Sequence, residues 1–146
     1  MQGDFSDMRY GFALTALAAI SGSPAMGGDS VDIDRSVFVE RSVEGVRALE
    51  PATRLRSGDK VVLMVEWRAE PGAKPVTVQS AVPPVLAFQR AGSDAVEVST
   101  DGGRNWGSLG DLKIGNRLAS AEDVTHLRMR VAGAPKGRMT FSAIVR

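Results

Sequence analysis

The residues best suited to binding or chemistry lie in a short polar segment that ends in a tryptophan. Ser99, Asp101, Gly103 and Trp106 follow the spacing S-x-D-x-G-x-x-W. A carboxylate at Asp101 can accept several backbone N–H groups across a tight loop, while a glycine at 103 can adopt a positive φ without a Cβ clash. The indole at 106 can then fold back over the turn. These four residues are predicted to form a structural hairpin turn.

Two residues of this segment, together with three residues further along the chain, could contact an anionic ligand. The candidate ligand-binding residues are Arg104, Trp106, His126, Arg128 and Arg130. Residues 125–131 alternate between apolar and polar, so the three polar ones near their centre are expected on one outward face, with Arg138 on the corresponding face of the next strand. Such a cationic stripe suits an envelope glycan, an anionic lipid headgroup or an acidic partner. A solvated charged face is the alternative.

Catalytic and metal sites have few candidate residues. The chain contains one histidine and no cysteine, so a Ser-His-acid triad would need His126, which is expected on an outward face, and a zinc site lacks ligands. Asp29, Asp32 and Asp34 are close in sequence, but they do not have the spacing of an EF-hand loop and are interpreted as a solvated acidic stretch. No catalytic residue, metal ligand or cofactor is assigned.

A glycosidase would need two carboxylates facing each other in a cleft lined by aromatic side chains. Glu66, Glu70, Glu97 and Asp101 are available, but only 5% of the residues are aromatic. Trp67 is expected in the core rather than in a sugar platform. We therefore do not expect an enzyme.

Composition limits the fold and the partners. The 146 residues suit one domain, and the many glycines and prolines with few aromatic residues favour short strands joined by turns. A net charge of +1 argues against a non-specific nucleic-acid binder, which needs a basic excess to neutralise phosphates. Without cysteine, no disulfide is expected.

The N-terminal segment resembles an export signal. Met8 and Arg9 precede an apolar run over residues 10–20, and Ser23-Pro24-Ala25 suits a cleavage site after Ala25. We predict a signal peptide over residues 1–25, with translation starting at Met8, and a periplasmic, cell-surface or secreted protein. The run is too short to span a bilayer, so an integral membrane protein is not expected. A buried helix or a membrane anchor is the alternative.

From Val31 onward the hydrophobic period is two, which indicates half-buried strands. The segment 31–43 is predicted as a strand or pair of strands, and 60–69 as a central strand because Val62 and Met64 make both of its faces apolar. About seven to nine short strands, with turns every 8–12 residues, predict an all-β sandwich. Residues 26–48 are expected to form an N-terminal strand or linker, and residues 49–146 the sandwich domain.

Four segments resemble a known family. LEPATRLRSGDKVVLMVEW (49–67), SAVPPVLAFQ (80–89), VSTDGGRNWGSL (98–109) and GRMTFSAIVR (137–146) are similar to the bacterial conserved-repeat domains known as domain of unknown function eleven. The resemblance implies an immunoglobulin-like (Ig-like) domain of cell-surface proteins with no catalytic residues. This chain has EPGAKP where the family has Asn-x-Gly, and it carries one copy of a unit that often occurs in tandem.

The segment from Ser99 to Trp106 also resembles the Asp-box hairpin of sialidases. Those enzymes are β-propellers, which need at least four four-stranded blades, and one copy in a chain of this length cannot build one. We therefore predict an exported, non-catalytic structural or protein-interaction module that self-associates by edge-strand pairing or binds another protein. A glycan- or anionic-lipid-binding module is the alternative, and an envelope enzyme is the third hypothesis.

Overall fold

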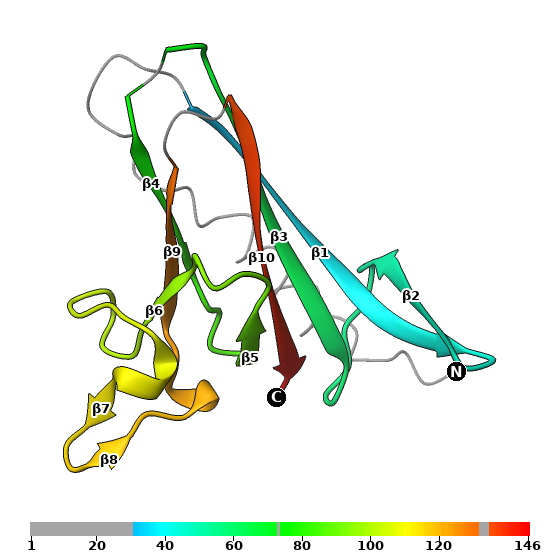
Figure 1. Ribbon diagram of the computed structural model, residues 1–146. Helices are drawn as coiled ribbons and strands as arrows, with labels where there is room; N and C mark the ends of the chain where they lie inside the picture. The colour runs from blue at the N-terminus through cyan, green and yellow to red at the C-terminus, as the bar shows by residue number, and fades with distance from the viewer. Residues whose placement is uncertain (1–30, 73, 132–134) are drawn as a thin grey trace.

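The computed structural model describes residues 31–72, 74–131 and 135–146, and these residues fold into antiparallel β-sheets without an α-helix (Figure 1). The largest sheet has five strands in the order β2-β1-β3-β10-β5. Its strands are β1 (Val31–Val43), β2 (Val46–Pro51), β3 (Lys60–Ala69), β10 (Lys136–Val145) and β5 (Leu86–Ala91). The predicted all-β class is confirmed.

A second sheet has three strands in the order β4-β9-β6, and β7 pairs with β8 in a small hairpin. These strands are β4 (Val76–Ala81), β9 (His126–Val131), β6 (Glu97–Ser99), β7 (Lys113–Ile114) and β8 (Arg117–Leu118). Two short 3₁₀ helices, η1 (Leu109–Asp111) and η2 (Ala121–Asp123), flank the small hairpin. The described residues thus form ten strands, more than the seven to nine expected.

One hydrophobic cluster joins the two larger sheets. Alternate residues of β3 and β10 are buried because side chains of a strand point to opposite faces with a period of two. The cluster includes Leu63, Trp67 and Phe141 of the five-stranded sheet and Val78 and Leu127 of the three-stranded sheet. The arrangement is sandwich-like, and Trp67 is in the core as predicted, with 3% of its surface exposed.

The central position of β3 follows from its sequence. Val61, Leu63 and Val65 are buried against the second sheet, while Val62 and Met64 on the other face are half-buried between β1 and β10. A strand with apolar residues on both faces is typical of the middle of a sheet, and β3 is the third of five strands. The sequence prediction of a central strand is confirmed.

Strand β2 was not predicted. Glu44 and Gly45 form a two-residue turn with φ values of +52° and +82°, and this turn reverses β1 into β2. Hairpin turns of this kind favour Asn-Gly, so the Glu-Gly pair gave no clear signal. The boundary expected between residues 48 and 49 falls within β2. The described part of segment 26–48 belongs to the sheet, since Val31 to Val39 of β1 pair with β3.

The cationic stripe does not continue from β9 to the next strand. Strand β9 lies in the three-stranded sheet, whereas β10, which carries Arg138, lies between β3 and β5 in the five-stranded sheet. The chain crosses from one sheet to the other between them, so the prediction that Arg138 extends the stripe is wrong. The alternation of apolar and polar residues along a strand can be seen in the sequence, but the sheet to which that strand belongs cannot.

The predicted signal peptide, its start at Met8 and its cleavage site lie outside the described residues. Within 31–72, 74–131 and 135–146, no helix is long and apolar enough to cross a membrane.

Candidate functional site

The predicted turn forms the end of strand β6. Val98 and Gly107 exchange two backbone hydrogen bonds, with N–O distances of 2.9 and 3.1 Å, and these bonds close a loop over residues 99–106. The side chain that organises the loop is Asp101. We call residues 98–107 the Asp101 hairpin.

Four hydrogen bonds converge on the Asp101 carboxylate. Its Oδ1 atom accepts from Ser99 Oγ at 2.8 Å, from the Asn105 backbone N–H at 2.9 Å and from the Arg104 backbone N–H at 3.1 Å. Its Oδ2 atom accepts from Asn105 Nδ2 at 2.6 Å. The backbone and side-chain donors of Asn105, followed by Ser99, hold the pKa of Asp101 well below its usual range. The predicted turn role of Asp101 thus corresponds to a network of donors around one carboxylate.

Ser99 and Gly103 complete the turn. Ser99 lies on the same strand face as Glu97, yet it is fully buried because its own loop folds over it. Its Oγ atom accepts the Gly103 N–H at 2.9 Å. Gly103 has a φ of +92°, and a Cβ atom at this position would lie 3.3 Å from the ring of Trp106. Only a residue without a side chain fits here without strain or displacement of the indole.

Trp106 covers the turn. Its Nε1–H donates to the Gly103 carbonyl at 2.9 Å. The guanidinium of Arg128, on β9, lies 4.6 Å from the ring centroid, in a cation–π arrangement. Arg128 Nε also donates to Glu97 Oε2 at 2.7 Å. Arg128 therefore belongs to the internal packing of the hairpin, since its charge is paired with Glu97 and its guanidinium lies over the indole of Trp106.

Thr125 ties the Asp101 hairpin to the start of β9. Its backbone N–H donates to the Ser99 carbonyl at 2.8 Å, and its Oγ1 accepts the Gly102 N–H at 3.0 Å. The same hydroxyl lies 3.0 Å from His126 Nδ1. Sequence reasoning missed Thr125 because it lies 24 residues beyond Asp101, and no local spacing links the two.

The structure therefore brings together only part of the predicted ligand-binding set. Trp106, Arg128 and His126 each contact residues of the Asp101 hairpin or its Thr125 anchor. Arg104 and Arg130 are exposed. A ligand at this surface would meet a hairpin whose central polar groups already have partners.

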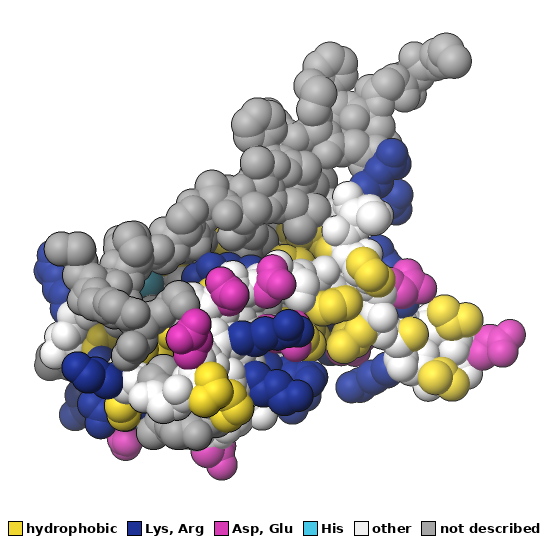
Figure 2. Space-filling view, turned by 90° about the horizontal axis from the view of Figure 1, so that it is seen from above, with side chains coloured by type: hydrophobic (Ala, Val, Ile, Leu, Met, Phe, Trp, Pro, Cys, Tyr) yellow, Lys and Arg dark blue, Asp and Glu magenta, His cyan; other side chains and the backbone are white. Residues whose placement is uncertain are grey.

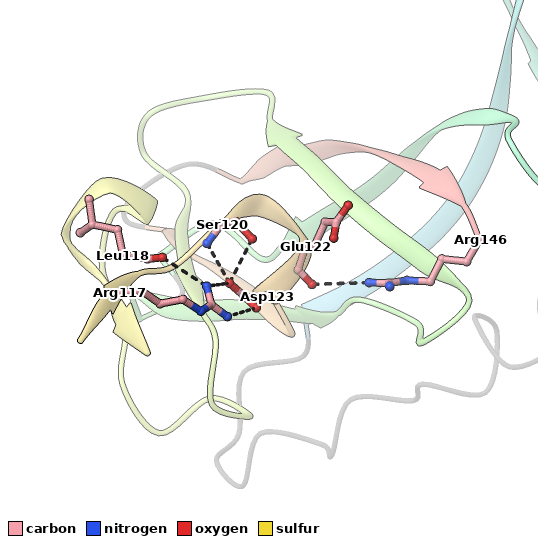
Figure 3. A network of polar contacts seen from close by, with 6 residues as sticks. All are labelled: Arg117, Leu118, Ser120, Glu122, Asp123 and Arg146. Atoms are coloured by element: carbon pink, nitrogen blue, oxygen red, sulfur yellow. Dashed lines mark hydrogen bonds and ion pairs between the residues drawn. The ribbon is translucent and has the colours of Figure 1, made fainter. Parts of the chain in front are cut away.

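A second polar cluster closes the β7–β8 hairpin onto η2 (Figure 3). Arg117 donates to both Asp123 carboxylate oxygens, with N–O distances of 2.8 and 3.0 Å. Asp123 also accepts from the N–H and the hydroxyl of Ser120, which directly precedes η2. The Arg117 hydrogen bond, followed by the Ser120 N–H, holds the pKa of Asp123 well below its usual range. Arg146, the last residue in the sequence, donates from Nη2 to the Glu122 carbonyl at 3.4 Å.

A charged groove of about 690 Å³ lies at one end of the five-stranded sheet. It is lined by residues 32–34 of β1, 66–68 of β3 and 136–138 of β10. Figure 2, which views the molecule from above, shows acidic and basic side chains lying next to one another. Asp32 is paired in register with Arg68, and Arg138 Nε lies 4.0 Å from Glu66 Oε1. The three acidic and three basic side chains of the groove thus balance in number, although Asp34 is in register with Glu66 and Lys136 with Arg68.

Trp67 lies in the middle row of the three strands that line this groove. Its register partner on β10 is Gly137, and a Cβ atom there would overlap the indole ring. The Nε1 atom of Trp67 is buried and has no hydrogen-bond partner. This glycine is required by packing, because the tryptophan occupies the space of the missing side chain.

No family model, characterised protein or solved structure matches the chain.

No cluster of three or more His, Cys, Asp or Glu side chains in the described ranges has the geometry to hold a metal ion. Asp32 and Asp34 lie on β1 beside the charged groove, while Asp29 falls outside the described residues. Glu97, one of the carboxylates considered for glycoside hydrolysis, is paired with Arg128.

Proposed function

We propose that the chain is an exported, non-catalytic Ig-like β-sandwich that serves as a structural or protein-interaction module of the cell envelope. Its interaction surface is the hairpin formed by β1 and β2, which we call the β1–β2 hairpin (residues 38–51). The observation that carries the proposal is the exposure of this hairpin. All six residues of β2 are exposed, and Val43 and Val46 beside the turn have 59% and 68% of their surface accessible.

The hairpin projects beyond the part of the sheet that is covered. Strand β3 pairs with β1 only as far as Val39, so residues 40–43 of β1 have backbone ladder pairs with β2 alone among the described strands. In Figure 1, β2 lies on the side of the five-stranded sheet that is away from β4, β9 and β6. A projecting hairpin with exposed valine and leucine side chains is typical of a contact surface.

Two further observations support the Ig-like part of the proposal. The two antiparallel sheets share one core, and a buried tryptophan on the central strand contributes to it. The segments from Leu49 onward resemble an Ig-like family of cell-surface proteins. The pattern of residues 8–25 supports export.

Export is tested by expressing the full chain with a C-terminal tag and sequencing the N-terminus of the product. We expect a mature protein that starts at Met26 in the periplasmic or secreted fraction. Leu14→Arg, which interrupts the apolar run, should keep the chain in the cytosol with its first residues intact. A wild-type product that stays in the cytosol with residues 1–25 attached would contradict the proposal.

The interaction surface is tested with a photo-crosslinking amino acid at single positions in living cells. We expect defined adducts of higher mass from Val46 and none from Leu118, which has 58% exposure in the other projecting hairpin. Adducts of equal yield at both positions would indicate random collision, and an absence of adducts at Val46 would overturn the role of the β1–β2 hairpin.

A further inference from the structure

Among the described strands, β2 is the outermost of the five-stranded sheet, and its outer edge has a defined hydrogen-bonding pattern. A two-residue turn makes Val43 and Val46 a hydrogen-bonded pair, and such pairs alternate along an antiparallel ladder. The Ala52 N–H donates to the Val37 carbonyl at 2.9 Å, which continues the same alternation beyond β2. Even-numbered residues of β2 therefore direct their backbone groups toward β1. Arg47 and Leu49 direct theirs away from the sheet.

The corresponding edge of β6 is closed. There, Val98 exchanges two hydrogen bonds with Gly107 of the returning chain, on the side opposite β9. At β2, Ser42, Glu40 and the other register partners all lie on β1. The outward N–H and C=O groups of Arg47 and Leu49 thus form a short edge that another strand can extend.

We infer that the partner of this edge is β2 of a second copy, paired antiparallel about a two-fold axis that passes between the two Ala48 residues. The inference rests on the proposed role of the β1–β2 hairpin as the interaction surface, and it names the partner. Arg47 of one copy then lies opposite Leu49 of the other, and this pair and its symmetry mate exchange four backbone hydrogen bonds.

Symmetry leaves few registers to choose from. A two-fold axis perpendicular to a sheet keeps each side chain on its own face, so one residue of β2 must lie opposite itself. Pairing about Arg47 would place two guanidinium groups opposite each other. Pairing about Leu49 would bring Pro51, which has no N–H, into the ladder. Pairing about Ala48 satisfies every outward donor and acceptor of Arg47 and Leu49.

The side chains and the shape of the hairpin suit this register. Glu50 lies opposite Val46 of the second copy, and Leu49 packs on the aliphatic part of Arg47, so no like charges face each other. Antiparallel pairing of two projecting hairpins directs the two sandwich bodies to opposite ends of the new ladder. A single strand pair buries less than about 1,200 Å² in total, so the dimer should be weak and depend on concentration.

A cysteine scan along β2 tests the register, because the chain contains no cysteine of its own. Residues opposite each other at a position without backbone hydrogen bonds have Cα atoms about 4.5 Å apart, within the range for a disulfide. In the proposed register Ala48 is such a position, while Arg47 and Leu49 lie about 7–8 Å from their own symmetry mates. The purified full-chain variants Ala48→Cys, Arg47→Cys and Leu49→Cys would be oxidised with diamide over a range of concentrations.

We expect Ala48→Cys to form a disulfide-linked dimer about tenfold faster than the other two variants. Lys113→Cys, on exposed strand β7, gives the rate of random collision. A fastest reaction at Arg47→Cys or Leu49→Cys would overturn the register, and equal rates at all four positions would overturn self-pairing. An exported protein that crosslinks to other proteins through Val46 but shows equal cysteine rates would retain the proposed function and refute only this inference.

Discussion

The Asp101 hairpin and the β1–β2 hairpin both reverse the chain in a tight turn, but different interactions hold the two turns. Each reverses the chain through residues with positive φ, Gly102 and Gly103 in one and Glu44 and Gly45 in the other. In the Asp101 hairpin, side chains then occupy the polar groups of the loop, and Trp106 covers it. In the β1–β2 hairpin, the backbone ladder to β1 and one exposed ion pair between Arg47 and Glu40 hold the strand.

The polar groups of the Asp101 hairpin are used within the fold, whereas the side chains of the β1–β2 hairpin remain accessible to a partner. Asp101, Ser99 and Trp106 direct their polar atoms into their own loop, so a partner would have to displace internal hydrogen bonds to use them. Val43 and Val46 have no such internal role and keep most of their surface exposed. A motif that attracts attention in the sequence therefore holds the fold together, while an inconspicuous segment offers the accessible surface.

The comparison predicts its largest effect at Ser99. Ser99→Ala removes the acceptor of the Gly103 N–H and one donor to Asp101 in a fully buried position, and should lower the free energy of unfolding by about 2 kcal/mol. Ser42→Ala, on the exposed β1–β2 hairpin, is the matched control and should change stability by less than about 0.5 kcal/mol. Urea denaturation measures both. Equal effects would show that the two hairpins are equally tied to the fold.

The second prediction compares two turn glycines. Alanine with a positive φ costs about 1 to 2 kcal/mol in either hairpin, but at Gly103 the new Cβ would also press on the Trp106 ring. At Gly45 no atom lies within 4 Å of the added Cβ. Gly103→Ala should therefore have a clearly lower melting temperature than Gly45→Ala. The reverse order in thermal denaturation would mean that Trp106 does not constrain the turn.

Acid should weaken the Asp101 hairpin. Because folding lowers the pKa of Asp101 below its ordinary value, its contribution to stability is complete above about pH 4 and declines as the pH falls toward the lower, folded pKa. Asp101→Asn should have a lower melting temperature than the wild type at pH 7, and the gap should narrow toward pH 2. Asp123 keeps its own pH dependence in both proteins, so the difference isolates Asp101. A gap that stays constant with pH would contradict this prediction.

Much of the fold could be predicted from sequence, because burial in strands follows a period of two. Strand β3 and the core position of Trp67 were both predicted, since each depends on residues close in sequence. Strand β2 was missed because Glu44-Gly45 is an uncommon turn pair and the strand itself has no buried face.

The contacts of the candidate site were predictable only where they are local. The Asp101 turn follows from its spacing, but the partners of Arg128 do not. Glu97 lies 31 residues away from it, and Trp106 reaches it only because the loop folds onto the outer face of the three-stranded sheet. The same alternation that identified Arg128 as outward-facing could not show that the outward face is covered there.

The smallest effect is expected at that arginine. Arg128→Ala removes a cation–π contact and an ion pair that is partly exposed, and should lower the free energy of unfolding by about 1 kcal/mol. Arg47→Ala, whose ion pair with Glu40 is longer and more exposed, should cost less than about 0.5 kcal/mol.

A double-mutant cycle with Trp106→Leu separates the two contributions of Arg128. If the cation–π contact contributes, the two substitutions should show a coupling of about 0.5 to 1 kcal/mol, whereas a cycle between Arg47→Ala and Trp106→Leu should be additive. Additivity in both cycles would leave the ion pair with Glu97 as the only contribution of Arg128. The guanidinium could then leave the indole without loss of stability. Arg128, on the outer face of the three-stranded sheet, would in that case be accessible to a ligand, as its sequence pattern suggested.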